Sequence, residues 1–211
     1  MAVTAHYNVI AARGLDRLAA LSDGLFAIAM TLIVLEIRVP DLARPASDGQ
    51  LAEALVGLAP RFVTYLMSFL TLGIFWSAQQ TQISYFDRAN RHLTWIHLGL
   101  LATVALMPFS TSLLAEYIDT RLAVILYWAN IAAFGVFISG SWLYATRAGL
   151  LKEGAEAEAS ASITRRIFIA QALYAFGAAL CLVSTYLSIA FIVLVQLNYA
   201  IAPRIPILER L

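Results

Sequence analysis

Few of the reactive side chains in this sequence stand at spacings that support catalysis or metal binding. The three histidines are His6, His92 and His97, and the closest two are five residues apart, whereas two imidazoles that share a metal on one helix are typically four apart. Cys181 is the only cysteine, which excludes an intrachain disulfide and a cysteine metal cluster. The sequence has no Gly-rich phosphate loop, no GxSxG or HExxH motif and no acidic pair at mid-span. We therefore expect no catalytic residue, no metal site, no cofactor and no enzymatic activity.

Polar side chains gather instead at one end of an apolar segment near the N-terminus. Residues 17–40 read RLAALSDGLFAIAMTLIVLEIRVP, with Arg17, Ser22 and Asp23 in the first seven positions. Asp23 lies about one helical turn inside the apolar run, where a lone carboxylate costs about 2.5–3.5 kcal/mol on insertion scales. We expect Asp23 to bind an arginine or another polar group on a neighbouring helix, which would make this end of the segment a rigid polar anchor.

A stripe at helical spacing follows the polar cluster. Taken from Gly24, the stripe continues at offsets of 4, 7, 8 and 11 with Ile28, Thr31, Leu32 and Leu35, which places all five residues on one face of a helix. Periodicity alone leaves two interpretations open. The face is either an ordinary apolar side of a spanning helix, with Thr31 bonded to its own backbone, or the lining of a pore.

The composition identifies the elements that must position these residues. Hydrophobic residues make up 61% and charged residues 13% of the 211 residues, and the mean hydropathy is +0.79, whereas soluble domains carry about 25% charged residues. The net charge of +1 excludes a nucleic-acid partner. We expect an all-α protein embedded in the lipid bilayer as a single domain over residues 1–211, because its apolar runs are continuous and do not alternate as barrel strands do.

Six apolar runs approach the length of about 20 residues that a spanning helix needs. They cover residues 18–37, 54–78, 93–114, 122–144, 167–183 and 187–202, the last two forming a tight helical hairpin. Residues 40–50 are expected to form an ordinary extracellular loop, and residues 153–162 a solvated linker in preference to a helical extension. With six spans, ten of the 14 Lys and Arg residues lie on the side of the two termini. The positive-inside rule then predicts a multi-pass protein of the inner (plasma) membrane with both termini in the cytoplasm.

The start of the first span resembles the RxxxFSD signature of the transmembrane protein 175 potassium channel family. Arg17, Ser22 and Asp23 match the signature, while Leu21 replaces its phenylalanine. The second and third spans carry further family-like residues, namely Phe75, Trp76, residues 106–111 and residues 115–117, and Gln79 stands where the family often has a histidine. The resemblance covers most of the first three spans, and the other three match only in number and hydrophobicity.

The resemblance implies a homotetramer with six transmembrane helices per subunit and a central pore lined by four copies of the first helix. It implies passive, potassium-favouring cation conduction, with K⁺ as the permeating ion. Ile28, Leu32 and Leu35 would face the pore as a hydrophobic constriction that is tightest at Ile28, and Thr31 would add a layer of hydroxyl groups. The structural anchor of this helix would consist of Arg17, Ser22, Asp23, Trp76 and Gln79.

Two other functions remain as alternatives. A proton or cation transporter would need carboxylates or histidines at the centre of the membrane, and the first span has acidic residues only near its ends, at Asp23 and Glu36. A non-catalytic membrane scaffold would need an interaction domain, and none is visible. Glu36 and Arg38 stand at the outer end of the first span, where a salt bridge between them is preferred to a role in concentrating cations.

Overall fold

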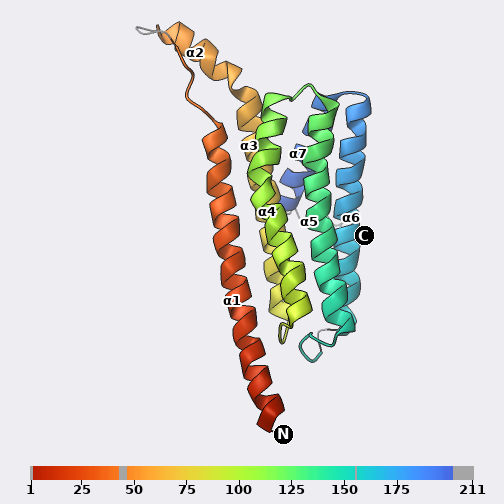
Figure 1. Cartoon of the computed structure of the whole chain (residues 1–211). Coiled ribbons are helices and arrows are strands. Elements are labelled where there is room, and N and C mark those ends of the chain that lie inside the picture. Colours follow the sequence, from red (N-terminus) through yellow and green to blue (C-terminus); the bar gives the residue numbers. More distant parts are fainter. Residues whose placement is uncertain (1, 43–46, 155, 202–211) are drawn as a thin grey trace.

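The computed structural model describes residues 2–42, 47–154 and 156–201, and they form a helical bundle with a single isolated β-bridge between Phe86 and Leu151. The long helices stand side by side, with α1 at one edge, and the short α2 projects from one end (Figure 1). The helices are α1 (Ala2–Leu32), α2 (Asp48–Gly57), α3 (Ala59–Tyr85), α4 (Arg91–Glu116), α5 (Arg121–Arg147), α6 (Glu156–Ala179) and α7 (Thr185–Ile201), and two short 3₁₀ segments, η1 (Ile33–Glu36) and η2 (Leu180–Leu182), continue α1 and α6.

Five helical segments of the described chain are long and apolar enough to cross a membrane. They are Gly14–Glu36, Ala59–Tyr85, Arg91–Glu116, Arg121–Arg147 and Ile163–Leu182. The sixth apolar run is also helical, but α7 has only 17 residues and falls short of the usual length of about 20. The multi-pass, all-helical architecture expected from the sequence is therefore present, with five spans identified by length and composition.

The connection after the first span differs from the expected loop. Residues 48–57 form α2, and a separate helix, α3, begins at Ala59, so the second span starts later than the predicted residue 54. A capping box starts α2: the Gln50 backbone N–H donates to Ser47 Oγ (3.3 Å) and the Ser47 N–H donates to Gln50 Oε1 (2.9 Å). Pro60, at the start of α3, suits the first turn of a new helix.

The expected linker at residues 153–162 is also wrong in part, because α6 begins at Glu156. This stretch is rich in Ala and Glu, which are good helix formers, so the helix extends beyond the apolar run. The hairpin between α6 and α7 is present. Its two helices are joined by a hydrogen bond from Ser188 Oγ to the Gly177 carbonyl oxygen (2.6 Å).

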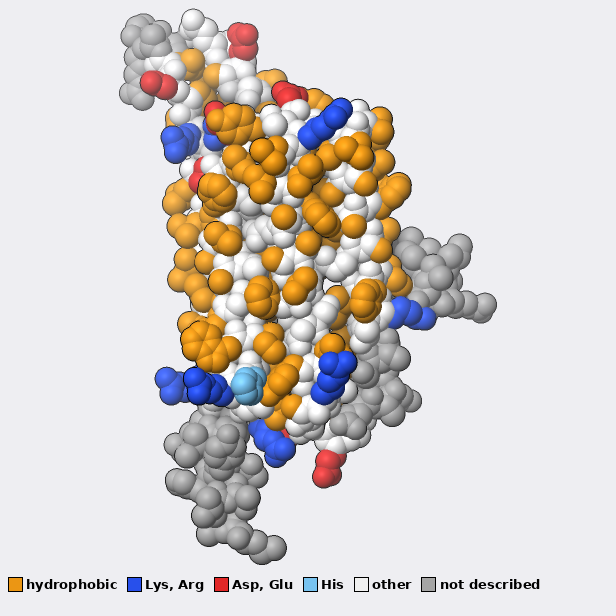
Figure 2. Space-filling model, turned by 45° about the vertical axis from the view of Figure 1, so that its right-hand side comes forward, with side chains coloured by type: hydrophobic (Ala, Val, Ile, Leu, Met, Phe, Trp, Pro, Cys, Tyr) orange, Lys and Arg blue, Asp and Glu red, His pale blue; other side chains and the backbone are white. Residues whose placement is uncertain are grey.

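The centre of the bundle is partly polar, and α3 contributes several of the buried polar side chains. Ser68 and Thr71 of α3 are fully buried, and each contacts the hydroxyl of Tyr127 of α5 at 3.2 Å. Gln196 of α7 donates to Thr71 Oγ1 (2.6 Å), and Thr111 of α4 donates to Ser68 Oγ (2.6 Å). Figure 2 shows that the outer surface is mostly hydrophobic between the two ends. Hydrogen bonds inside and apolar side chains outside are typical of helices packed within a membrane.

Candidate functional site on the first helix

The two faces of α1 have different surroundings. Phe26, Ala29 and Ile33 are buried against the bundle, with at most 2% of their surface exposed. On the other face, Ile28 is 54% exposed and Leu35 67%. The stripe predicted from the spacing therefore points away from the rest of its own subunit, at the edge of the bundle (Figure 1).

Leu32 and Thr31 share this outward face, and both are exposed. The Thr31 hydroxyl donates its proton to the Ile28 carbonyl oxygen at 2.8 Å. Because a hydroxyl carries one proton and two acceptor lone pairs, this bond occupies the proton and leaves the oxygen free to accept. An outward-facing threonine in this state presents an oxygen ligand to a cation.

The polar anchor at the Asp23 end of the spanning segment of α1, here called the inner anchor, is built around Asp23. Its Oδ1 accepts hydrogen bonds from the indole N–H of Trp76 (2.8 Å) and from the amide of Gln80 (2.5 Å), both on α3. The partners of Asp23 are therefore neutral donors on the neighbouring helix, and the alternative of an arginine is wrong for the described chain. Gln80 was missed from the sequence, although it stands four residues after Trp76 and so shares its helix face.

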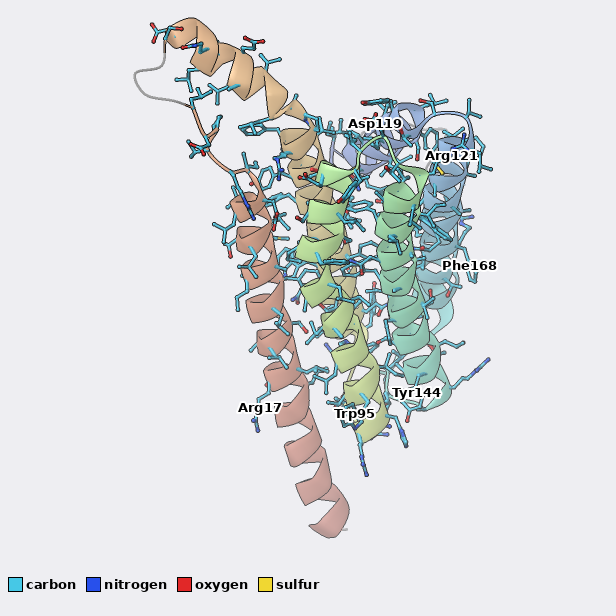
Figure 3. All side chains as sticks on the ribbon, turned by 45° about the horizontal axis from the view of Figure 1, so that its top comes forward. Arg17, Trp95, Asp119, Arg121, Tyr144 and Phe168 are labelled. Carbon is cyan, nitrogen blue, oxygen red and sulfur yellow. The ribbon has the colours of Figure 1, made fainter. Side chains whose placement is uncertain are left out.

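Ser22 completes the inner anchor in the interior of the subunit. It is fully buried, donates to the Leu18 carbonyl oxygen (2.9 Å) and accepts from the Gln79 amide (2.8 Å). Arg17 does not join this group: it is exposed, points away from the bundle in Figure 3 and forms no ion pair with any described residue. Four of the five residues predicted for the anchor thus lie together, and Arg17 lies apart.

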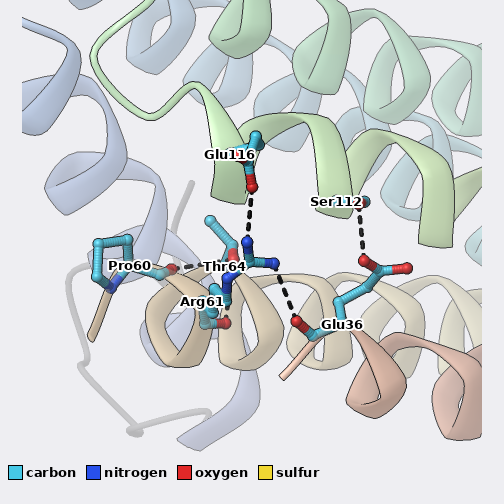
Figure 4. Close-up of polar contacts among 6 residues, drawn as sticks. All are labelled: Glu36, Pro60, Arg61, Thr64, Ser112 and Glu116. Carbon is cyan, nitrogen blue, oxygen red and sulfur yellow. Dashed lines mark hydrogen bonds and ion pairs between the residues drawn. The ribbon is translucent and has the colours of Figure 1, made fainter. Parts of the chain in front are cut away.

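A second anchor holds the other end of this helix, at η1 (Figure 4). Arg61 of α3 donates to the Glu36 carbonyl oxygen (3.1 Å) and forms an ion pair with Glu116 of α4 (2.6 Å). The Glu36 carboxylate accepts from Ser112 Oγ at 2.7 Å. The expected salt bridge between Glu36 and Arg38 is absent from the described residues, because the Glu36 carboxylate is turned toward α4.

The outward face between the two anchors carries no formal charge. Residues 24–35 include no ionisable side chain. Any interaction of this face with an ion therefore depends on Thr31, on backbone dipoles and on water.

Comparison with known proteins identifies the family of this chain. A family model described as the endosomal/lysosomal potassium channel TMEM175 matches residues 17–108. A potassium channel of Streptomyces collinus is 35% identical over 188 residues, which cover 87% of this chain and 90% of that protein. The chain belongs to the TMEM175 family. A second member, a potassium channel of Chamaesiphon minutus, is 31% identical over 189 residues, covering 88% of this chain and 93% of its own.

The fold is also that of a solved TMEM175 protein. The crystal structure of a lysosomal potassium-selective channel TMEM175 homolog from Chamaesiphon minutus matches with a TM-score of 0.79 and 28% identity, over 91% of this chain and 99% of that one. The human protein, named an endosomal/lysosomal proton channel, is 34% identical over 100 residues, which are 20% of its length. The TMEM175 family consists of ion channels, so this chain is assigned to channels and not to enzymes.

Proposed function

We propose that this TMEM175-family protein is a potassium-favouring cation channel that works as a homotetramer. The observation that carries the proposal is the outward, uncharged face of α1 with Ile28 at its centre. A single helix cannot enclose a pore, so the face has to be multiplied by symmetry. Four copies of α1 around one axis would turn these four faces toward each other. The names of the relatives, potassium channels, indicate K⁺ as the permeating ion.

The outward apolar residues supply the gate. Rings of Ile28, Leu32 and Leu35 form a hydrophobic constriction, tightest at Ile28, which excludes water and ions when it is narrow. Slight widening admits water and a partly hydrated cation. Conduction is then passive and runs down the electrochemical gradient.

Selectivity follows from partial dehydration at the constriction. K⁺ holds its hydration shell less tightly than Na⁺, so a ring that removes water favours K⁺. Four Thr31 oxygens, whose protons are engaged by the Ile28 carbonyl, replace part of the lost water. The selectivity should be modest, because a hydroxyl ring offers fewer ligands than a carbonyl-lined filter.

The proposed topology has six spans in one domain over residues 1–211. The short α7 serves as the sixth span, fastened inside the subunit by the hydrogen bond from Gln196 to Thr71. With six spans, ten of the 14 Lys and Arg residues fall on the side of the two termini. By the positive-inside rule this side is the cytoplasmic one and the membrane is the plasma membrane.

Flux through purified protein in liposomes tests the proposal. K⁺ and Na⁺ gradients are imposed in turn on wild type and on the variants I28N and T31V. I28N should raise the flux of both ions, because the asparagine side chains retain water in the ring. The isosteric loss of the Thr31 hydroxyl should lower the ratio of K⁺ to Na⁺ flux. The control is F168A, which removes a side chain 67% exposed on α6 and leaves α1 unchanged.

The proposal fails if flux is insensitive to both α1 substitutions, which would place the pathway elsewhere in the bundle. It also fails if cross-linking shows the conducting particle to be a monomer. A pH-sensitive dye inside the same liposomes tests the second candidate, proton conduction, which the names of the vertebrate relatives favour. If the proton flux exceeds the K⁺ flux at matched driving force, the preferred ion is the proton and not K⁺.

A further inference from the structure

Unpaired positive charge is concentrated at one end of the bundle. Arg88, Arg91, Arg147 and Lys152, here called the basic rim, lie at the ends of α4 and α5 and in the loops beside them. The described residues contain one ion pair, Arg61 with Glu116 at the opposite end, and none of the four rim cations takes part in it. Figure 2 shows Lys and Arg side chains gathered along this lower end of the molecule, below a mostly hydrophobic band.

Two of the rim cations stand at the neighbouring ends of α4 and α5. Arg91 is the first residue of α4 and Arg147 the last residue of α5. The two helix ends are tied by a hydrogen bond from Asn90 Nδ2 to the Tyr144 hydroxyl (2.9 Å) and by the rings of His92 and Tyr144, whose centroids are 6.0 Å apart. Arg91 and Arg147 therefore flank a fixed junction between two neighbouring helices.

Aromatic side chains lie one helical turn further into the bundle from these arginines. Trp95 stands four residues after Arg91, Tyr144 stands three before Arg147, and such spacings place each pair on one helix face. Trp95 is 63% exposed. Figure 3 shows Trp95 and Tyr144 at the same end of α4 and α5. Amphipathic rings at this depth are typical of the boundary between headgroups and acyl chains.

The other two rim cations add positive potential without being neutralised. Arg88 donates to the Gly149 carbonyl oxygen (3.3 Å) and Lys152 to the Ser84 carbonyl oxygen (2.7 Å). Asp87 and Glu153 are the acidic residues of these loops, and both are exposed. Neither lies within 4.0 Å of a basic group among the described residues.

We propose that the junction of α4 and α5 binds an anionic phospholipid of the phosphatidylglycerol type. The lipid phosphate sits between Arg91 and Arg147, and the glycerol and upper acyl chain lie along Trp95. The arginines lie at the end of the bundle and the aromatic rings lie one helical turn deeper. A phospholipid has the same order, with its phosphate at the surface and its acyl chains below. This site lies away from the outward face of α1 and does not depend on ion conduction.

Quenching of tryptophan fluorescence by brominated lipid tests the site on the full-length protein. Wild type, W95F, R91Q/R147Q and R91K/R147K are reconstituted into phosphatidylcholine vesicles that contain increasing fractions of brominated phosphatidylglycerol. The Trp95 signal is the difference between each protein and the same protein carrying W95F. Brominated phosphatidylcholine measures contact with ordinary lipid. The matched control is R121Q, which removes an exposed arginine from the opposite end of α5 (Figure 3).

We expect half-maximal quenching of Trp95 in wild type at a much lower fraction of brominated phosphatidylglycerol than of brominated phosphatidylcholine. In the R91Q/R147Q variant, half-maximal quenching should require about fivefold more anionic lipid for each charge removed. This factor corresponds to about 1 kcal/mol per cation near the membrane surface. R91K/R147K should retain most of the preference, since it keeps both charges, and R121Q should match wild type.

Three results would overturn the proposal. The first is an unchanged preference for anionic lipid in R91Q/R147Q. The second is an equal loss in R121Q, which would show a general effect of net charge. The third is displacement of the lipid by excess inorganic phosphate, which would make the junction a site for free anions. Elution of every variant at the wild-type position in gel filtration excludes unfolding as the cause of a loss.

Discussion

Gln79 of the inner anchor is fully buried, yet only one end of its amide has a partner. Its Nε2 donates to Ser22 Oγ at 2.8 Å, while no described residue donates a hydrogen bond to its Oε1. A buried acceptor without a partner costs about 1–3 kcal/mol, and an interhelical hydrogen bond in a membrane contributes about 0.6 kcal/mol on average. The amide therefore costs at least as much as it contributes.

Replacing Gln79 with leucine should leave the subunit as stable as wild type, or more stable by up to about 2 kcal/mol. Leucine fills nearly the same volume and removes the unsatisfied oxygen. Ser22 keeps its donor bond to the Leu18 carbonyl oxygen, so no donor is left without a partner. Q79A removes the same oxygen but leaves a cavity, and large-to-small substitutions of this kind cost about 2–5 kcal/mol.

Unfolding by titration with sodium dodecyl sulfate, followed by circular dichroism, measures both free energies. We expect Q79L to be the more stable of the two variants by at least about 2 kcal/mol. The comparison variant Q80L should be less stable than wild type, because it removes a donor from the charged Asp23. If Q79L is destabilised as much as Q79A, Oε1 has a partner such as a buried water, and the reasoning from an unsatisfied acceptor is wrong.

Four further substitutions test the packing of the bundle by the same titration. Y127F removes the hydroxyl that contacts two α3 side chains and should cost about 1–2 kcal/mol. In G99A the new Cβ would meet the Phe137 ring at 2.3 Å, so we expect a loss of about 1–3 kcal/mol, whereas G140A, with no atom within 4 Å, should be neutral or slightly stabilising. R61Q breaks a partly exposed ion pair and should cost about 1 kcal/mol or less, but hydrogen–deuterium exchange in η1 should become faster than in wild type.

The sequence was sufficient to predict the apolar helices, five of which are long enough to span a membrane, because length and hydrophobicity are local properties of each run. It was less informative at the helix ends, where single side chains decide the outcome. Ser47 and Gln50 have the spacing of a capping box, and this pattern, followed by an apolar run, was a visible signal for α2. In the same way, the stretch rich in Ala and Glu at the start of α6 favoured a helix over the linker that was expected.

For the candidate site, the outward stripe of α1 could be predicted because it depends on the period of one helix. The partners of Asp23 and Glu36 could not, because Trp76 and Ser112 are 53 and 76 residues away in the chain and meet them only through helix packing. One signal for this packing was overlooked. Buried Thr64, Ser68 and Thr71 recur every three or four residues, and a polar stripe on a spanning helix indicates the face turned toward other helices.

The two anchors determine which face of α1 is turned outward within a single subunit. Asp23 and Glu36 stand near opposite ends of the spanning segment, and each is held by directional hydrogen bonds to α3 or α4. A shift in register by one residue rotates a helix by about 100°, which would break both sets of bonds and expose Phe26. The outward position of Ile28 is therefore set by the fold of the single chain. Substitutions on the outward face should then change conduction with little effect on subunit stability, whereas substitutions at the anchors should change stability first.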